Sequence, residues 1–220
     1  MSATFDLFES REEWPENRKK GLGGSDIAAV IGENPWMSNV DLWEIKTGRK
    51  PQADLSNNTY VQYGHEAERH IAHLYALDHP EYNCATADFN SWTNPDYPWA
   101  VASLDGWMSD PEKDRVGVLE IKTSTIQRAS DWSKWEGGIP QQYFCQVLFY
   151  MAVIEADFAD LRAAIKYTAK EGDQRTTIRD YHIERSEVEE DIRYLMEQGA
   201  RFWESVEKGI RPALILPELR

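Results

Sequence analysis

The chain has 220 residues, of which 41% are hydrophobic and 12% aromatic, so a disordered protein is excluded and one sizeable core is expected. No apolar run reaches the length of a membrane span and the N-terminus does not resemble a signal peptide, so we expect a cytoplasmic protein without a membrane partner. The net charge of −14 argues against a nucleic-acid binder, unless the basic residues gather in one channel.

The first third of the chain is expected to be mainly helical. A charged helix is predicted up to Lys20, followed by the glycine-rich segment 21–32, in which Ser25 is predicted to cap a short helix. A glycine-rich loop that enters a helix favours an anion, although a plain tight turn explains the same residues. Ser38 predicts the cap of the next helix, and apolar periodicity predicts a longer helix from about Tyr60 to Leu77.

The rest of the chain alternates strands and helices. Strand patterns lie at Cys84–Phe89, Trp99–Met108, Val116–Thr123, Leu161–Thr168 and Thr176–Glu184, an apolar helix runs from about Gln141 to Glu155, and a last helix is expected from a cap at Ser186 to about Lys208. Neither a linker nor a repeat divides this order. It therefore predicts a single mixed α/β domain over residues 1–220, with a central sheet flanked by helices.

Three ionisable residues stand out on adjacent strand patterns. Glu120 and Lys122 are separated by one residue, so their side chains leave a strand on the same face, and Asp105 ends the preceding apolar run. A polar turn at residues 111–115 allows the two runs to pair as a hairpin. Two carboxylates can hold Mg²⁺, and a lysine beside the ion can orient or deprotonate a water. The alternative is a turn beside a solvated strand edge.

Two further polar residues border apolar helix faces. Glu68 lies next to the apolar stripe of the Tyr60–Leu77 helix, where it is either solvated or held by a cation. Gln146 interrupts an apolar run, and a buried amide needs hydrogen-bond partners, which are either backbone groups or a water or phosphate in a site. The two cysteines, Cys84 and Cys145, have no neighbours at the spacing of zinc ligands.

Taken in order, these motifs resemble the lambda-exonuclease-like (YqaJ-type) viral recombinase family, within the PD-(D/E)XK nuclease superfamily. The matching pieces are Gly23-Gly24-Ser25-Asp26, Gly64-His65-Glu66-Ala67-Glu68, Ser103-Leu104-Asp105-Gly106, Leu119-Glu120-Ile121-Lys122 and Tyr143-Phe144-Cys145-Gln146-Val147. Leu104 stands where the superfamily name has proline. The resemblance implies an α/β fold with a restriction-endonuclease-like core, a central mixed β-sheet flanked by helices.

The resemblance also implies an activity. Such a protein would be a metal-dependent 5′→3′ exonuclease that degrades the 5′ strand of linear double-stranded DNA and leaves 3′ overhangs for phage recombination by single-strand annealing. Its partners would be a single-strand annealing protein and two further copies in a homotrimer, in the cytoplasm of a bacterial host. The alternatives are another nuclease of this fold, an endonuclease or one preferring single strands, and a noncatalytic acidic protein that binds a recombination partner or mimics DNA.

By the same resemblance, the motif residues would hold two metal ions. Asp105, Glu120 and the Ile121 carbonyl would bind one ion. Glu68 would bind the second, with Glu66 as the alternative ligand. The ions would be Mg²⁺, with Mn²⁺ as the alternative, and a pair of ions can stabilise both the attacking and the leaving oxygen at phosphorus.

The remaining motif residues would act on water and on the DNA end. Lys122 would activate or position the attacking water, and Gln146 would help to hold it. Arg18 and Ser25 would bind the terminal 5′-phosphate, in agreement with an anion site at the glycine-rich loop. These two residues favour an exonuclease that binds DNA ends over an enzyme that cuts internally.

Overall fold

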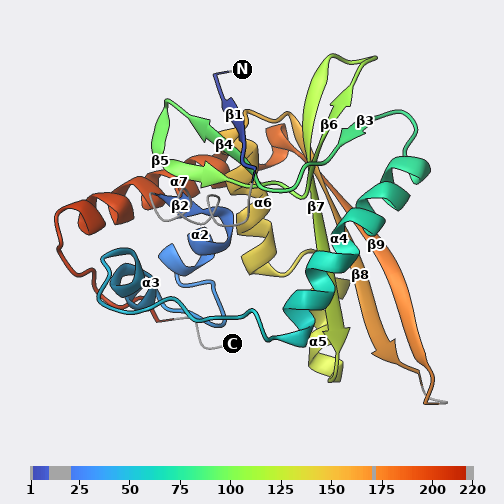
Figure 1. The fold of residues 1–220 in the computed structure, drawn as a ribbon, viewed down its shortest axis with the longest axis horizontal. Helices are drawn as coiled ribbons and strands as arrows, with labels where there is room; N and C mark the ends of the chain where they lie inside the picture. The colour runs from blue at the N-terminus through green and yellow to red at the C-terminus, as the bar shows by residue number, and fades with distance from the viewer. Residues whose placement is uncertain (1, 10–20, 170–171, 217–220) are drawn as a thin grey trace.

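The computed structural model describes residues 2–9, 21–169 and 172–216 and is built around a mixed sheet in the order β3-β6-β7-β8-β9 (Figure 1). These strands are Asn83–Ala85, Gly106–Asp110, Arg115–Ile126, Phe158–Thr168 and Gln174–Glu184. β7 and β8 pair in parallel, and the other neighbours pair antiparallel. The expected central mixed sheet is confirmed.

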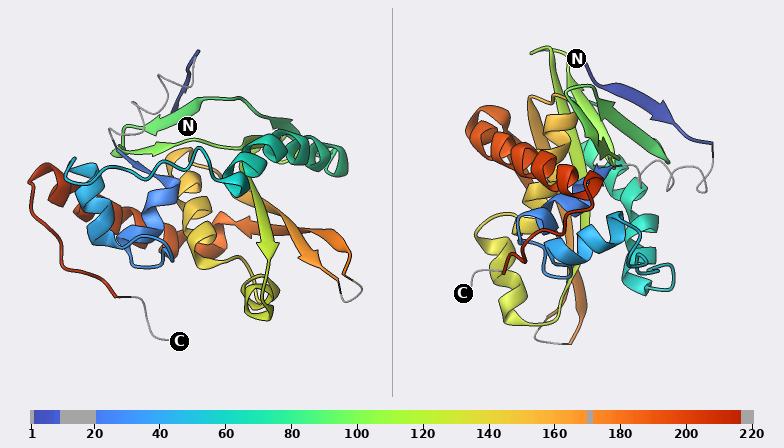
Figure 2. Two further views of the ribbon diagram at one scale, coloured as in Figure 1. Left: turned by 60° about the horizontal axis from the view of Figure 1, so that its bottom comes forward. Right: turned by 90° about the vertical axis from the view of Figure 1, so that its left-hand side faces the viewer.

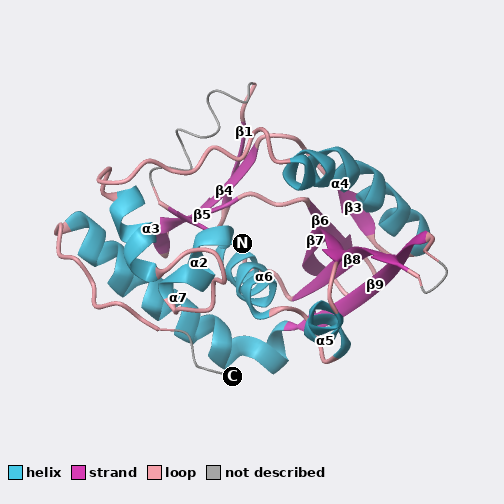
Figure 3. Ribbon diagram, turned by 90° about the horizontal axis from the view of Figure 1, so that it is seen from below, coloured by secondary structure: helices cyan, strands magenta, loops and turns pink. Residues whose placement is uncertain are grey.

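Helices cover both faces of this sheet, as Figure 3 shows, with α4 on one side and α5 and α6 on the other. The helices are α2 (Gly24–Val30), α3 (Asn39–Lys46), α4 (Thr59–Asp78), α5 (Ala129–Glu136), α6 (Gln141–Val153) and α7 (Arg185–Glu207). Figure 2 shows α2, α3 and α7 gathered beyond the sheet, next to α6. In the described part of the chain, no helix combines the length and apolarity needed to cross a membrane.

A second, smaller sheet, with the order β1-β4-β5-β2, was not predicted. Its strands are Thr4–Leu7, Asn90–Asn94, Tyr97–Ala102 and Leu22–Gly23. β1 corrects the expectation that the N-terminal segment is helical, while residues 10–20 lie outside the described residues. The ring of Phe5 lies 4.8 Å from that of Trp92 and 5.4 Å from that of Trp107, so aromatic packing with distant residues stabilises β1.

Two helices begin at other residues than expected. α2 starts at Gly24 with Gly23 as its N-cap, and the Gly23 N–H donates to the Asp26 carboxylate at 2.9 Å, so Ser25 is not the cap. α7 starts at Arg185 with Glu184 as its N-cap, which places Ser186 inside the helix. The cap predicted for α3 is confirmed, because the Ser38 hydroxyl accepts from the Asp41 N–H at 3.1 Å.

The run predicted as one strand at Trp99–Met108 forms two strands, because the chain crosses from the smaller sheet to the central one at residues 103–105. Asn90 fixes this crossing. Its amide Nδ2 donates to the Leu104 carbonyl at 2.8 Å, and its Oδ1 accepts from the Leu104 N–H at 2.9 Å. Asp105 therefore stands at the point where the chain joins the central sheet.

Candidate metal centre

Asp105, Glu120 and Lys122 meet at the edge of β7, at the point where β6 begins. Because β6 pairs with β7 only as far as Leu119, the β7 edge beyond that residue is lined by the turn at Asp105. Asp105 Oδ2 accepts from the Ile121 N–H at 2.8 Å. Lys122 Nζ donates to Glu120 Oε1 at 2.5 Å. The structure therefore brings together the three residues that the hairpin pattern singled out.

Gln146 on α6 joins the same hydrogen-bonded chain. Its Nε2 donates to Glu120 Oε1 at 2.7 Å and to the Tyr150 hydroxyl at 3.0 Å. Lys122 Nζ lies 5.1 Å from the centroid of the Tyr143 ring. Neither tyrosine was predicted from the sequence to have a role in the site. Their spacing of three residues before and four after Gln146 places all three on one helix face, and that pattern could have found them.

α4 brings Glu68 to this site. Gly64, one turn earlier on the same face, lies so close to β7 that a Cβ there would be 3.4 Å from Thr123 Oγ1. Glu68 is half-buried, and the charge of Asp105 acts on its carboxyl, whereas Glu66 is exposed. The geometry thus favours Glu68 over Glu66.

Burial raises the pKa of all three carboxyl groups. Together with the nearby charge of Asp105, burial raises the pKa of Glu120 to about 8 and that of Glu68 to about 7. Burial also raises the pKa of Asp105, although the Lys122 ammonium and the Ile121 N–H oppose the change. For Lys122, burial lowers the pKa, but the charges of Glu120 and Asp105 outweigh that effect and raise it, so the ammonium is charged at neutral pH.

These donors fit a divalent cation. Glu120 Oε2 is buried and accepts no hydrogen bond from the described residues, which costs free energy in the absence of a bound cation. Carboxylate and backbone carbonyl oxygens are the hard ligands that Mg²⁺ prefers. In the part of the chain that the structure describes, no three His, Cys, Asp or Glu side chains stand close enough to hold an ion as they are. An ion at this site would therefore also use the Ile121 carbonyl oxygen or water as ligands.

The raised pKa values predict that the metal-free protein loses stability as the pH rises. Between the unfolded value of 4.5 and the folded values of about 7 for Glu68 and about 8 for Glu120, the folded state holds more protons than the unfolded state. The free energy of unfolding therefore falls across this range. Because metal ligands must be deprotonated, Mg²⁺ should stabilise the protein more above pH 8 than below pH 6. Thermal melts with EDTA or Mg²⁺ test this, and a pH-independent effect of Mg²⁺ would contradict it.

The glycine-rich loop packs against the same hydrogen-bonded chain. A Cβ at Gly24 would lie 2.3 Å from Tyr150 Cε1, so α2 begins in direct contact with the tyrosine that Gln146 binds. Only glycine allows this approach. The loop and the carboxylates are thus connected through two side chains of α6.

Of the two residues expected to bind a 5′-phosphate, the structure describes Ser25. Ser25 is exposed in the first turn of α2, while Arg18 lies outside the described residues. The glycine-rich loop before Ser25 is fixed by Asp26, which accepts from the Gly23 N–H at 2.9 Å and pairs with Lys46 Nζ at 2.8 Å. The structure therefore leaves the Ser25 hydroxyl accessible and does not test its pairing with Arg18.

The close contact at Gly24 makes a testable prediction about stability. Gly24→Ala should lower the free energy of unfolding by about 1–3 kcal/mol, because Tyr150 must shift to accept the methyl group. Gly137→Ala is the matched control, since a Cβ there meets no atom within 4 Å and φ is −92°. Urea unfolding of both variants tests the contact. Equal stability of the two would show that Tyr150 is not packed against the loop.

Known proteins are similar to this chain in sequence. The chain matches the model of the YqaJ-like viral recombinase domain over residues 13–159. The "Uncharacterized protein YqaJ" of Bacillus subtilis (strain 168) is 31% identical over 180 residues, which are 74% of this chain and 50% of that protein, so the chain spans about half the length of this relative.

Solved structures are similar in fold. The alkaline exonuclease LHK-Exo from Laribacter hongkongensis superposes with a TM-score of 0.63 and 20% identity, over 90% of this chain and 94% of that chain. A phage-related exonuclease from Haemophilus somnus 129PT gives a TM-score of 0.55 and 13% identity, over 86% and 96%. These likenesses confirm the restriction-endonuclease-like fold expected from the sequence.

Proposed function

Because the chain belongs to the YqaJ-like viral recombinase family, we propose that it is a divalent-metal-dependent exonuclease that degrades the 5′ strand of linear double-stranded DNA. Digestion in the 5′→3′ direction would leave 3′ overhangs for phage recombination by single-strand annealing. The observation that carries the proposal is the buried Glu120 Oε2, which accepts no hydrogen bond from the described residues and lies beside Asp105 and Lys122. A noncatalytic acidic protein has no need of such a group.

The proposed ligands are Asp105, Glu120 and the Ile121 carbonyl for one ion and Glu68 for a second. Bound divalent ions supply a water of lowered pKa and neutralise charge at the scissile phosphate. Because the pKa of Lys122 is raised, its ammonium is suited to orient that water and to stabilise negative charge, rather than to accept the proton.

Gln146 and Tyr150 are proposed to position the site. Gln146 Nε2 holds one oxygen of Glu120, and the other oxygen, which accepts no hydrogen bond from the described residues, would bind an ion. Tyr150 fixes the Gln146 amide and contacts Gly24. The contact supports a 5′-phosphate site at Ser25, with Arg18 as its second residue, because it places the glycine-rich loop next to the carboxylates.

The proposal extends to the assembly. Residues 1–220 would act as one nuclease domain within a homotrimer that encloses the DNA, in the cytoplasm of a bacterial host, with a single-strand annealing protein as partner. The net charge of −14 supports a ring, because a closed ring separates an acidic exterior from the path of the DNA.

The test uses linear duplex DNA that carries a 5′-phosphate on one strand only, incubated with Mg²⁺, with Mn²⁺ or with EDTA. We expect metal-dependent loss of the phosphorylated strand, with closed circular DNA left intact. Arg18→Ala and Ser25→Ala should each reduce the preference for the phosphorylated end. Cutting of circles would indicate an endonuclease, digestion of single strands alone would indicate a single-strand nuclease, and no cleavage with either ion would overturn the proposal.

A further inference from the structure

Lys166, on β8, differs from every other lysine in the described ranges in having no carboxylate partner. The paired lysines are Lys46, Lys50, Lys113, Lys122, Lys134 and Lys208. Lys166 Nζ instead lies 3.3 Å from the centroid of the Tyr63 ring. A cation–π contact orients an ammonium without neutralising it. Although the chain has a net charge of −14, no carboxylate of the described residues neutralises this ammonium, so it can attract an external anion.

Two exposed tyrosines lie in the first two turns of α4, and the second, Tyr63, is the ring below this lysine. Tyr60 is 60% exposed and Tyr63 is 45% exposed. Gln127, just beyond β7, donates from Nε2 to the Tyr60 hydroxyl at 3.2 Å, which ties the Tyr60 ring to the end of that strand. Exposed aromatic rings next to an unpaired cation are the components of surfaces that bind single-stranded nucleic acid, because bases stack on the rings and phosphates approach the cation.

Side chains along α6 contact both β7 and the glycine-rich loop. Tyr143 near the start of α6 lies over Lys122, and Gln146 one turn later binds Glu120. The helix therefore runs opposite to β7. Tyr150, a further turn along, points its hydroxyl back to Gln146 at 3.0 Å, and Gly24 packs against the Tyr150 ring on this α6 side of the site.

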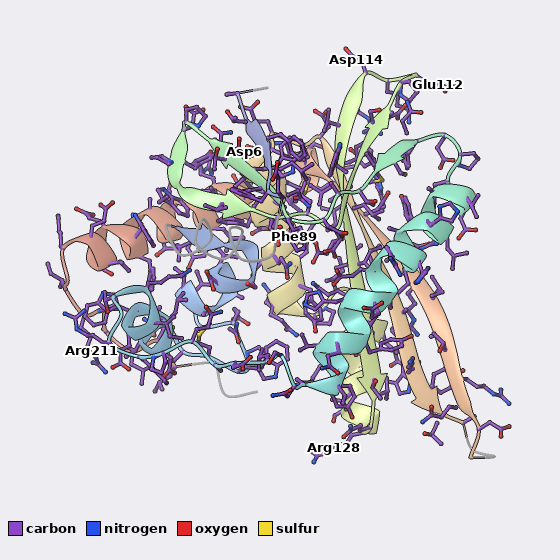
Figure 4. The ribbon with its side chains drawn as sticks, in the orientation of Figure 1. Asp6, Phe89, Glu112, Asp114, Arg128 and Arg211 are labelled. Atoms are coloured by element: carbon purple, nitrogen blue, oxygen red, sulfur yellow. The ribbon has the colours of Figure 1, made fainter. Side chains whose placement is uncertain are left out.

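Measured along β7, Tyr60, Tyr63 and Lys166 lie beyond Glu120, nearer the end of the strand. Thr125 of β7 is the register partner of Lys166, so this group lies five residues beyond Glu120, or about 16 Å along the strand. Figure 4 shows Arg128 at this same end of the molecule and the acidic residues Glu112 and Asp114 at the opposite end. Strand alternation turns Lys166 toward α4 and Glu120 toward α6, so the group is connected to the carboxylates through α4, on which Glu68 follows Tyr60 by eight residues, or about 12 Å. A strand with its 5′ end at the glycine-rich loop beside α6 and a phosphate at Glu120 would continue past Glu68 and along α4 toward this group.

We propose that Tyr60, Tyr63, Gln127 and Lys166 form a binding surface for single-stranded DNA, which takes the nucleotides that follow the scissile phosphate in the strand being degraded. The Tyr60 ring stacks on a base, and Lys166, held over Tyr63, contacts a phosphate. The choice of strand rests on the proposed exonuclease function, whereas binding of single-stranded DNA requires neither metal nor cleavage. Strands held in this way would already be separated from their complement.

Binding is tested by fluorescence anisotropy with a labelled single-stranded oligonucleotide in EDTA. Tyr60→Ala should weaken binding about 5-fold or more, which corresponds to the loss of one stacked base. Lys166→Ala should reduce the slope of log affinity against log salt by about 0.7, as expected for one phosphate contact. Tyr194→Ala and Lys208→Ala are matched controls on α7, where Tyr194 is 52% exposed and the Lys208 side chain 59% exposed, and they should leave binding unchanged.

Cleavage assays separate this inference from the proposed function. In the Tyr60→Ala, Lys166→Ala double variant, KM for linear duplex should rise several-fold while kcat stays near the wild-type value. If the wild type cleaves but affinity, salt slope and KM are all unchanged in the variants, the surface is wrong and the exonuclease stands. If the wild type does not cleave yet Tyr60→Ala and Lys166→Ala weaken single-strand binding, the surface stands and the exonuclease is wrong.

Discussion

Lys122→Ala should slow cleavage of linear duplex DNA by at least about 100-fold, while the protein still binds the duplex. The variant lacks the charged ammonium that lies 2.5 Å from Glu120 Oε1 and next to the expected position of the attacking water. It also lacks the charge that favours ionised Glu120, so metal affinity falls as well. Initial rates at saturating Mg²⁺ measure the first effect, and binding in EDTA shows that the duplex is still recognised.

Folding has to be controlled in this experiment. Removing one partner of a buried ion pair costs about 3–5 kcal/mol, so the alanine variant can lose stability as well as activity. Lys122→Met keeps most of the side-chain volume and should fold better, yet it should be equally inactive. Lys208→Ala, at an exposed pair with Glu204, should retain full activity. A folded Lys122→Met protein with a near wild-type rate would remove Lys122 from the catalytic site.

Glu120→Gln should abolish the response to metal while leaving the metal-free protein folded. The amide preserves the shape of the side chain and can still accept hydrogen bonds from Lys122 and Gln146 through its oxygen. Because burial raises the pKa of the wild-type carboxyl to about 8, the neutral amide should change the stability of the metal-free protein less than Lys122→Ala does. Cleavage should fall at least about 100-fold, and Mg²⁺ should no longer raise the melting temperature.

Two glutamates of α4 provide the matched comparison for Glu120→Gln. Glu68→Gln should reduce cleavage strongly, because the half-buried carboxyl lies within the field of Asp105. Glu66→Gln, at an exposed position, should have a rate close to that of the wild type. The opposite result would assign the second ion to Glu66 and would mean that α4 turns about its axis when metal binds.

Local patterns in the sequence predicted the elements whose formation depends on their own residues. α3 has its Ser38 cap, α4 has an apolar stripe, and the β6–β7 hairpin has a polar turn, so each was found close to its observed position. β1 and α5 were missed. All four residues of β1 are exposed, and α5 is anchored by Trp135, whose ring lies 6.0 Å from that of Tyr181. Such contacts with distant residues leave no periodic signal.

Part of the candidate site was likewise predictable from local patterns, and part depends on packing between distant elements. Asp105, Glu120 and Lys122 were recognisable from the sequence, because strand alternation and one short turn are enough to bring them together. Only the tertiary structure determined the contacts between side chains of different helices and strands. It brought Glu68, rather than the exposed Glu66, within reach of the charge of Asp105, joined Tyr150 to Gly24, and placed Lys166 over Tyr63. A helix sequence determines which residues share a face, but only packing determines which face meets the sheet.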